Sequence, residues 1–162
     1  QTANLLITHE LFDRLGGFEA GWTPGGGKEL GEDAWLGWRA KRLGATVAFA
    51  TDAVVEHAVI PRGAAGYVAE RRRLAAFPAM VDRIPELRST LCWRRPFLTA
   101  RGAAFDAAAI GLLAAAVTRR PAPLALALPY LRHRPGPAHA AADAVGAAAL
   151  LAGSIKARRL LL

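Results

Sequence analysis

Cysteine is almost absent from the chain, with Cys92 the only one in 162 residues. A single cysteine excludes an internal disulfide, and no second cysteine stands at metal-ligand spacing. A reducing compartment therefore fits the composition. Charged residues make up only 21% of the chain against 53% hydrophobic residues, which argues against wholesale disorder. We expect a globular or membrane-associated chain with a real core.

Negative charge is the scarcer sign, because 13 acidic residues face 21 lysines and arginines and leave a formal net charge of +8. Such an excess indicates nucleic acid, an anionic membrane face or a phosphate-bearing substrate as a partner. The chain has no nucleic-acid recognition motif and no interleaving of aromatic and basic residues, so nucleic acid is set aside.

A starting methionine and a signal sequence are also missing, since the chain begins with Gln1. Residues 3–7 have the apolar pattern of a strand that is already under way. We therefore expect a fragment whose beginning is missing.

Short helices and strands are predicted to alternate over the first 62 residues. Thr8 fits the N-cap of a helix that continues to Leu15, and Gly16-Gly17 can end it in left-handed conformation. The other elements expected here are a strand at 3–7, a loop over 19–30, a helix over about 32–43 that stops at Gly44, and strands at 46–50 and 54–57. This pattern predicts an α/β fold.

Two blocks of residues in this region form an ordered set. Its members are Gly16-Gly17-Phe18-Glu19, Gly31-Glu32-Asp33, Arg39, Gly44 and His57. The ordered set is much more specific than any member alone, and it resembles the C-terminal half of the catalytic domain of family 2 glycosyltransferases. The resemblance covers about residues 1–62. It implies the C-terminal part of a GT-A domain (nucleotide-diphospho-sugar transferase, Rossmann-like) that moves a sugar from a nucleotide donor to an acceptor hydroxyl.

Two adjacent carboxylates are the candidate catalytic groups. Transfer to an alcohol needs a base that takes the hydroxyl proton, and by resemblance Asp33 matches the catalytic base of inverting family members. Glu32 beside it would position or bind the acceptor. The alternative is that both residues only complement a helix N-terminus, which acidic residues commonly do.

The candidate metal ligand is His57, which resembles a histidine that in some family members helps to bind the divalent ion on the donor diphosphate. Mn²⁺ or Mg²⁺ is the cofactor that the resemblance implies, and imidazole is a reasonable ligand for manganese. The alternative is an ordinary partly buried histidine. The family's principal metal site is an aspartate pair separated by one residue, and no such triplet occurs in this sequence. We expect the donor-binding half to be missing and the fragment to be inactive alone.

An aromatic residue beside a glycine run is a candidate for the acceptor site. Trp22 can stack on the C–H face of a sugar, and glycines near it permit closure. The alternative is a plain surface loop in which Trp22 covers the core. One of Trp35 and Trp38 is expected in the core and the other near the rim. Arg39 is expected to be structural, through pairing with a neighbouring carboxylate.

A basic helical connector is predicted over residues 63–102. Arg71 could reach the donor diphosphate, because guanidinium groups bind phosphate oxygens in pairs. A solvated helix face or an anionic lipid contact explains Arg71 and its two arginine neighbours equally well.

The tail, residues 103–162, contains three alanine- and leucine-rich runs with basic residues at their ends. The first two, 103–117 and 122–131, are short for a bilayer, and the third, 138–155, contains Asp143. We expect a helical hairpin at or in an anionic membrane surface, at the cytoplasmic face of the cell membrane; the alternative is a soluble helical bundle.

Together these observations predict part of a membrane-associated inverting glycosyltransferase of cell-envelope or polysaccharide synthesis. Its partners would be a nucleotide-sugar donor and a glycan or lipid-linked acceptor. The alternative function is a noncatalytic membrane-anchoring or assembly module derived from such an enzyme.

Overall fold

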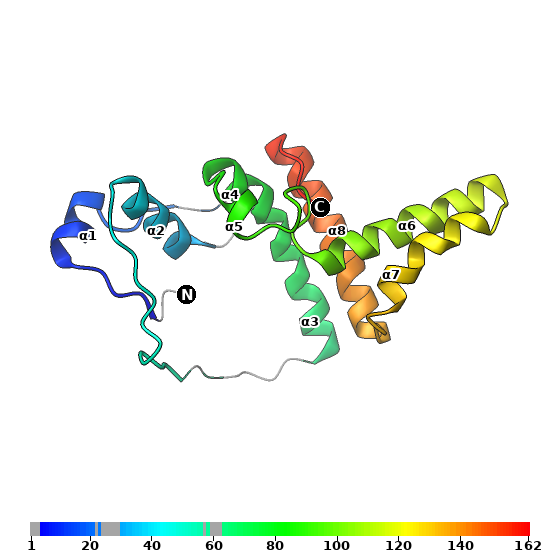
Figure 1. Ribbon diagram of the computed structural model, residues 1–162, viewed down its shortest axis with the longest axis horizontal. Coiled ribbons are helices and arrows are strands. Elements are labelled where there is room, and N and C mark those ends of the chain that lie inside the picture. Colours follow the sequence, from blue (N-terminus) through cyan, green and yellow to red (C-terminus); the bar gives the residue numbers. More distant parts are fainter. Residues whose placement is uncertain (1–3, 22, 24–29, 57, 59–62) are drawn as a thin grey trace. The chain divides into compact units, whose positions relative to one another are not determined.

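The computed structural model describes residues 4–21, 23, 30–56, 58 and 63–162, and helices are the regular elements of this part of the chain (Figure 1). It contains no strand and no sheet apart from an isolated antiparallel bridge between Trp93 and Phe97. The prediction of an α/β, Rossmann-like GT-A domain is therefore wrong for the described residues. The chain divides into two compact units, residues 1–61 and 62–162.

The predicted strands are extended segments that pair with no neighbouring strand. Residues 5–7, 45–50 and 53–56 have no helical conformation and no ladder of backbone hydrogen bonds in the described structure. Their apolar side chains are largely exposed, with Leu6 85% and Phe49 91% accessible. Apolar patterning identified extended backbone here, but a strand also needs a partner for its N–H and C=O groups.

The first unit contains two helices, α1 (His9–Leu15) and α2 (Glu32–Arg42). The hydroxyl of Thr8 accepts a hydrogen bond from the Leu11 amide at 3.3 Å, so the predicted N-cap of α1 is confirmed. Gly16 ends α1 in left-handed conformation at φ 70°, where a side chain would be strained.

The second unit is a helical assembly. Its elements are α3 (Ala64–Glu70), the 3₁₀ helix η2 (Arg71–Ala76), α4 (Phe77–Arg83), α5 (Leu87–Thr90), α6 (Ala100–Thr118), the 3₁₀ helix η3 (Ala122–Ala127), α7 (Leu128–Leu131) and α8 (Pro137–Ala157). Its fully buried side chains include Val81, Ile84 and Leu161.

Helix α8 is the central element of the second unit, and it packs against η2, α3 and α4. Two glycines allow this close approach. A Cβ on Gly146 would lie 3.1 Å from Leu74 Cδ1, and a Cβ on Gly153 would collide with the backbone carbonyl of Ala75. Ser154 accepts from the Leu161 amide at 2.9 Å and donates to the Leu161 carbonyl at 2.8 Å, which holds the C-terminal residues on α8.

Helix α6 forms a hairpin with η3 and α7 (Figure 1). Gly111 makes the hairpin tight, since a Cβ there would lie 2.5 Å from the Pro123 carbonyl oxygen and 2.9 Å from Leu126 Cβ. Both α6 and α8 are long and apolar enough to cross a membrane by length and composition. They differ in packing, because far more of α8 is buried within the protein.

Candidate functional site

The N-terminus of α2 holds the two candidate catalytic carboxylates. Gly31 precedes the helix in left-handed conformation at φ 78°, and Glu32 and Asp33 occupy its first turn. Both side chains are half-buried. Asp33 Oδ1 accepts a hydrogen bond from the Ala34 amide at 2.7 Å. This bond fixes the orientation of the carboxylate at the helix start, so the geometry suits a base and also suits a residue that only stabilises the helix start.

Arg39 joins α2 to the end of α1. Its guanidinium donates to the Leu15 carbonyl oxygen at 2.8 Å and, by a second short bond, to the Gly17 carbonyl oxygen. The residue is structural, as expected, but its resolved partners are backbone carbonyls rather than a neighbouring carboxylate. Planar guanidinium geometry allows one side chain to satisfy two acceptors on a turn.

A second bond ties the same two blocks together. The indole Nε1 of Trp35 donates to Glu19 Oε2 at 2.7 Å. Trp35 is buried, whereas Trp38 is half-buried with the ammonium of Lys41 4.6 Å from its ring centroid. The expected division between one core tryptophan and one nearer the surface is confirmed. The Gly-Gly-Phe-Glu block thus lies against the helix that begins in the Gly-Glu-Asp block.

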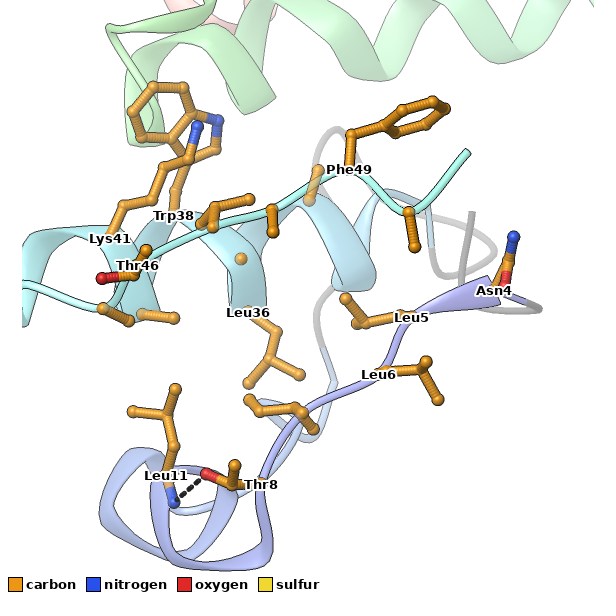
Figure 2. A pocket seen from close by; sticks show the side chains of 18 of the residues that line it. Asn4, Leu5, Leu6, Thr8, Leu11, Leu36, Trp38, Lys41, Thr46 and Phe49 are labelled. Atoms are coloured by element: carbon orange, nitrogen blue, oxygen red, sulfur yellow. Dashed lines mark hydrogen bonds between the residues drawn. The ribbon is translucent and has the colours of Figure 1, made fainter. Parts of the chain in front are cut away.

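An apolar groove of about 490 Å³ lies in the first unit (Figure 2). It is lined by residues 4–8, one face of α2 and residues 45–50, with Leu5, Leu36 and Phe49 among its side chains. The amide of Asn4 donates to the Ala53 carbonyl at 2.8 Å and ties the two extended segments together. Glu32 and Asp33 do not line this groove, so it gives no support for their roles.

Three other predicted site residues have different outcomes. Trp22 and His57 lie outside the described residues, and their acceptor-binding and metal-binding roles stay predictions. Arg71 is described and belongs to the second unit. Its guanidinium donates to the Tyr67 hydroxyl at 2.6 Å and lies 4.8 Å from the Tyr67 ring centroid. Its diphosphate-binding role also stays a prediction.

The described part of the chain contains no ligand set for a divalent metal. No group of three or more His, Cys, Asp or Glu side chains there could hold an ion. No step of the chemistry is therefore derived through a metal.

A polar cluster in the second unit was missed by sequence reasoning. Asp143 Oδ2 accepts from Arg101 Nη2 at 2.8 Å, from Arg101 Nε at 3.0 Å and from the Tyr130 hydroxyl at 2.7 Å. Burial and then the bond to Asp143 raise the pKa of Tyr130. The cluster ties α6, α7 and α8 together. The sequence signal for this cluster is Asp143, a carboxylate within the apolar run at 138–155. In the sequence analysis that residue bears only on whether the run could span a membrane.

Comparison with protein-family models, with curated proteins and with solved structures found no match. The resemblance to glycosyltransferases therefore depends on the motif residues of the sequence alone.

Proposed function

We propose that this chain supplies the acceptor side of an inverting glycosyltransferase, with Asp33 as the general base and Glu32 as the group that positions the acceptor. One observation supports this most: Arg39 and Trp35 hold the Gly-Gly-Phe-Glu block against the helix that begins with these two carboxylates. The proposal depends on this local arrangement and requires no sheet in the described residues.

The chemistry asked of Asp33 is a single proton transfer. The acceptor hydroxyl oxygen forms a bond to the anomeric carbon of the donor, the bond from that carbon to the nucleoside diphosphate breaks, and the hydroxyl proton passes to the carboxylate. Half-burial of Asp33 excludes part of the surrounding water. The Ala34 amide fixes the orientation of its Oδ1. This arrangement leaves the carboxylate held in place before the acceptor arrives.

The remaining partners belong to the same proposal. The donor is a nucleotide sugar, the cofactor would be Mn²⁺ or Mg²⁺, and the acceptor is a glycan or a lipid-linked sugar. A lipid-linked acceptor places the enzyme at the cytoplasmic face of the cell membrane, in cell-envelope or polysaccharide synthesis. The two apolar helices of the second unit support membrane association.

A panel of nucleotide-sugar donors tests the proposal. Hydrolysis or transfer is measured with the complete protein in which this chain occurs, with Mn²⁺, with Mg²⁺ and with a chelator. We expect turnover of one donor class and its loss in the chelator. Absence of turnover with every donor, together with absence of nucleotide binding by calorimetry, would contradict the proposal.

A noncatalytic membrane-anchoring or assembly module is the second candidate. Exposed leucines and isoleucine along α6, η3 and α7 favour it, because they form an apolar surface that needs a partner. Membrane binding without any nucleotide-sugar binding would select this candidate over the enzyme.

A further inference from the structure

The α6 hairpin exposes apolar side chains where a soluble helix would expose polar ones. We define the apolar hairpin as residues 110–131, the distal half of α6 with η3 and α7. Its exposed large side chains are Ile110, Leu112, Leu113, Val117, Leu124, Leu126, Leu128 and Leu131. The hydroxyl of Thr118 donates to the Ala114 carbonyl at 2.7 Å, so the polar atom of that side chain is satisfied within the helix.

The exposed side of α6 is apolar all the way round. Gly111 and Ala104 mark the buried side of the helix. At 100° per residue, Leu112 lies about 160° around the helix from Ile110, and Leu113 lies between them on the side away from Gly111. A protein partner normally covers one stripe of a helix, and this apolar surface is wider than one stripe. The distribution therefore favours lipid as the occupant.

Charge around the hairpin has one sign. No aspartate or glutamate occurs between Asp106 and Asp143, whereas Arg119 and Arg120 stand at the hairpin turn and Arg132 and Arg134 follow α7. Arg119 at φ 53° and Arg134 at φ 45° occupy left-handed positions that glycine fills more easily. Arginines at both ends of an apolar surface complement the anionic headgroups of a lipid leaflet.

The lengths of the two limbs exclude a crossing hairpin. The 19 residues of α6 extend about 28 Å, close to the roughly 30 Å of a bilayer core. The return limb of η3 and α7 reaches only about 18 Å before Arg132. If Arg119 and Arg120 reached the far side, Arg132 and Arg134 would be left within the hydrocarbon, which is costly for charged side chains.

We propose that the apolar hairpin lies flat in the interface of an anionic leaflet, with its arginines at headgroup level, while α8 stays in the protein core. The inference rests on the membrane association in the proposed function and makes it specific to one element. It differs from the sequence-based view, in which the run at 138–155 was the nearest to a membrane span.

Two matched isoleucines test which helix meets the lipid. Ile110 on α6 is 60% exposed and Ile155 on α8 is 71% exposed, so Gln at either position leaves the core intact. Co-sedimentation is measured for the intact chain with vesicles of phosphatidylcholine, with and without phosphatidylglycerol. We expect about tenfold or more tighter binding to the anionic vesicles. Ile110→Gln should weaken that binding about tenfold or more, and Ile155→Gln less than about twofold.

Equal losses from the two variants would overturn the assignment to the hairpin. Failure of the unmodified chain to sediment with either vesicle would overturn membrane association itself. Circular dichroism of each variant shows that its helices remain. Because no sugar transfer is measured, neither result depends on whether the chain is an enzyme.

A thiol-labelling experiment distinguishes a flat hairpin from a crossing one. In a Cys92→Ser background, Arg120→Cys places the only thiol at the hairpin turn. An impermeant maleimide added outside sealed anionic vesicles should label it without detergent. Protection that disappears only after detergent is added would overturn the flat orientation.

Discussion

The two units of the chain bury apolar side chains to very different extents. Among the described residues of unit 1 the buried hydrophobic ones are Trp35, Leu36 and Ala40, all on α2, while Leu6, Phe49 and Val54 are each more than four-fifths exposed. In unit 2 the elements η2, α3, α4 and α6 pack against α8, and Ser154 holds the C-terminal residues on it. The candidate catalytic residues thus lie in the sparsely packed unit. Stability should be sensitive to changes in unit 2, and activity to changes in unit 1.

The largest effect on stability is expected from Gly153→Ala in unit 2. A methyl group at this position collides with the Ala75 carbonyl, so α8 and η2 must separate, at a cost of about 3 kcal/mol in the free energy of unfolding. Gly37→Ala on α2 of unit 1 is the control, since no atom lies within 4 Å of a Cβ there. It should be neutral or stabilise by up to about 1 kcal/mol. Urea denaturation measures both, and equal effects would contradict the difference between the units.

The next effect is expected from Asp143→Asn, which removes the charge shared by Arg101 and Tyr130. The side chain of Asp143 is only 16% exposed, so loss of its charge-assisted bonds should cost about 2 kcal/mol. Asp82→Asn removes a comparable partner from Arg159, but that ion pair is exposed and should contribute less than about 0.5 kcal/mol. Thermal and urea denaturation compare the two, and a larger loss from Asp82 would contradict the expectation.

Local sequence signals predicted much of the helical structure but none of the long-range pairing. The cap at Thr8 and the stop at Gly16 depend on neighbouring residues, and they were read correctly. The predicted runs at 103–117 and 138–155 fall within α6 and α8. The predicted strands depended on partners that apolar patterning does not reveal.

In the candidate site, too, local features were predictable from the sequence and long-range contacts were not. Asp33 at a helix start was predictable, because acidic residues and a preceding glycine are local signals. The acceptors of Arg39 were not, because they are backbone carbonyls more than 20 residues away, which leave no mark in the amino-acid pattern. Asp143 and Arg101 are 42 residues apart and pair only through the packing of α6 on α8.

A smaller, local effect is expected from Arg39→Lys in unit 1. A lysine ammonium cannot reproduce the guanidinium fork on the Leu15 and Gly17 carbonyls, so the link between α1 and α2 should weaken by about 1 kcal/mol. Amide hydrogen exchange of α1 and α2 measures this. Arg14→Lys is the matched exposed control and should leave exchange unchanged. Unchanged exchange in Arg39→Lys would show that the link does not hold the two motif blocks together.

The smallest effect on stability is expected from Asp106 in unit 2. Burial raises the pKa of its carboxyl above the ordinary value of 3.8. The folded state therefore loses stability as pH rises from 3.8 through the folded pKa, and this penalty is absent below 3.8. Asp106→Asn should be more stable than the unmodified chain at neutral pH, and the difference should vanish in acid. A variant that is less stable at neutral pH would contradict the direction.

The most direct test of the proposed base is Asp33→Asn in the complete protein in which this chain occurs. Asp52→Asn is the matched control, an exposed carboxylate of unit 1. Sugar transfer is measured with the donor that the panel identifies. Loss of a general base should lower turnover by about 10²- to 10⁴-fold in Asp33→Asn and leave Asp52→Asn near normal. Near-normal turnover in Asp33→Asn would show that the carboxylate only stabilises the start of α2.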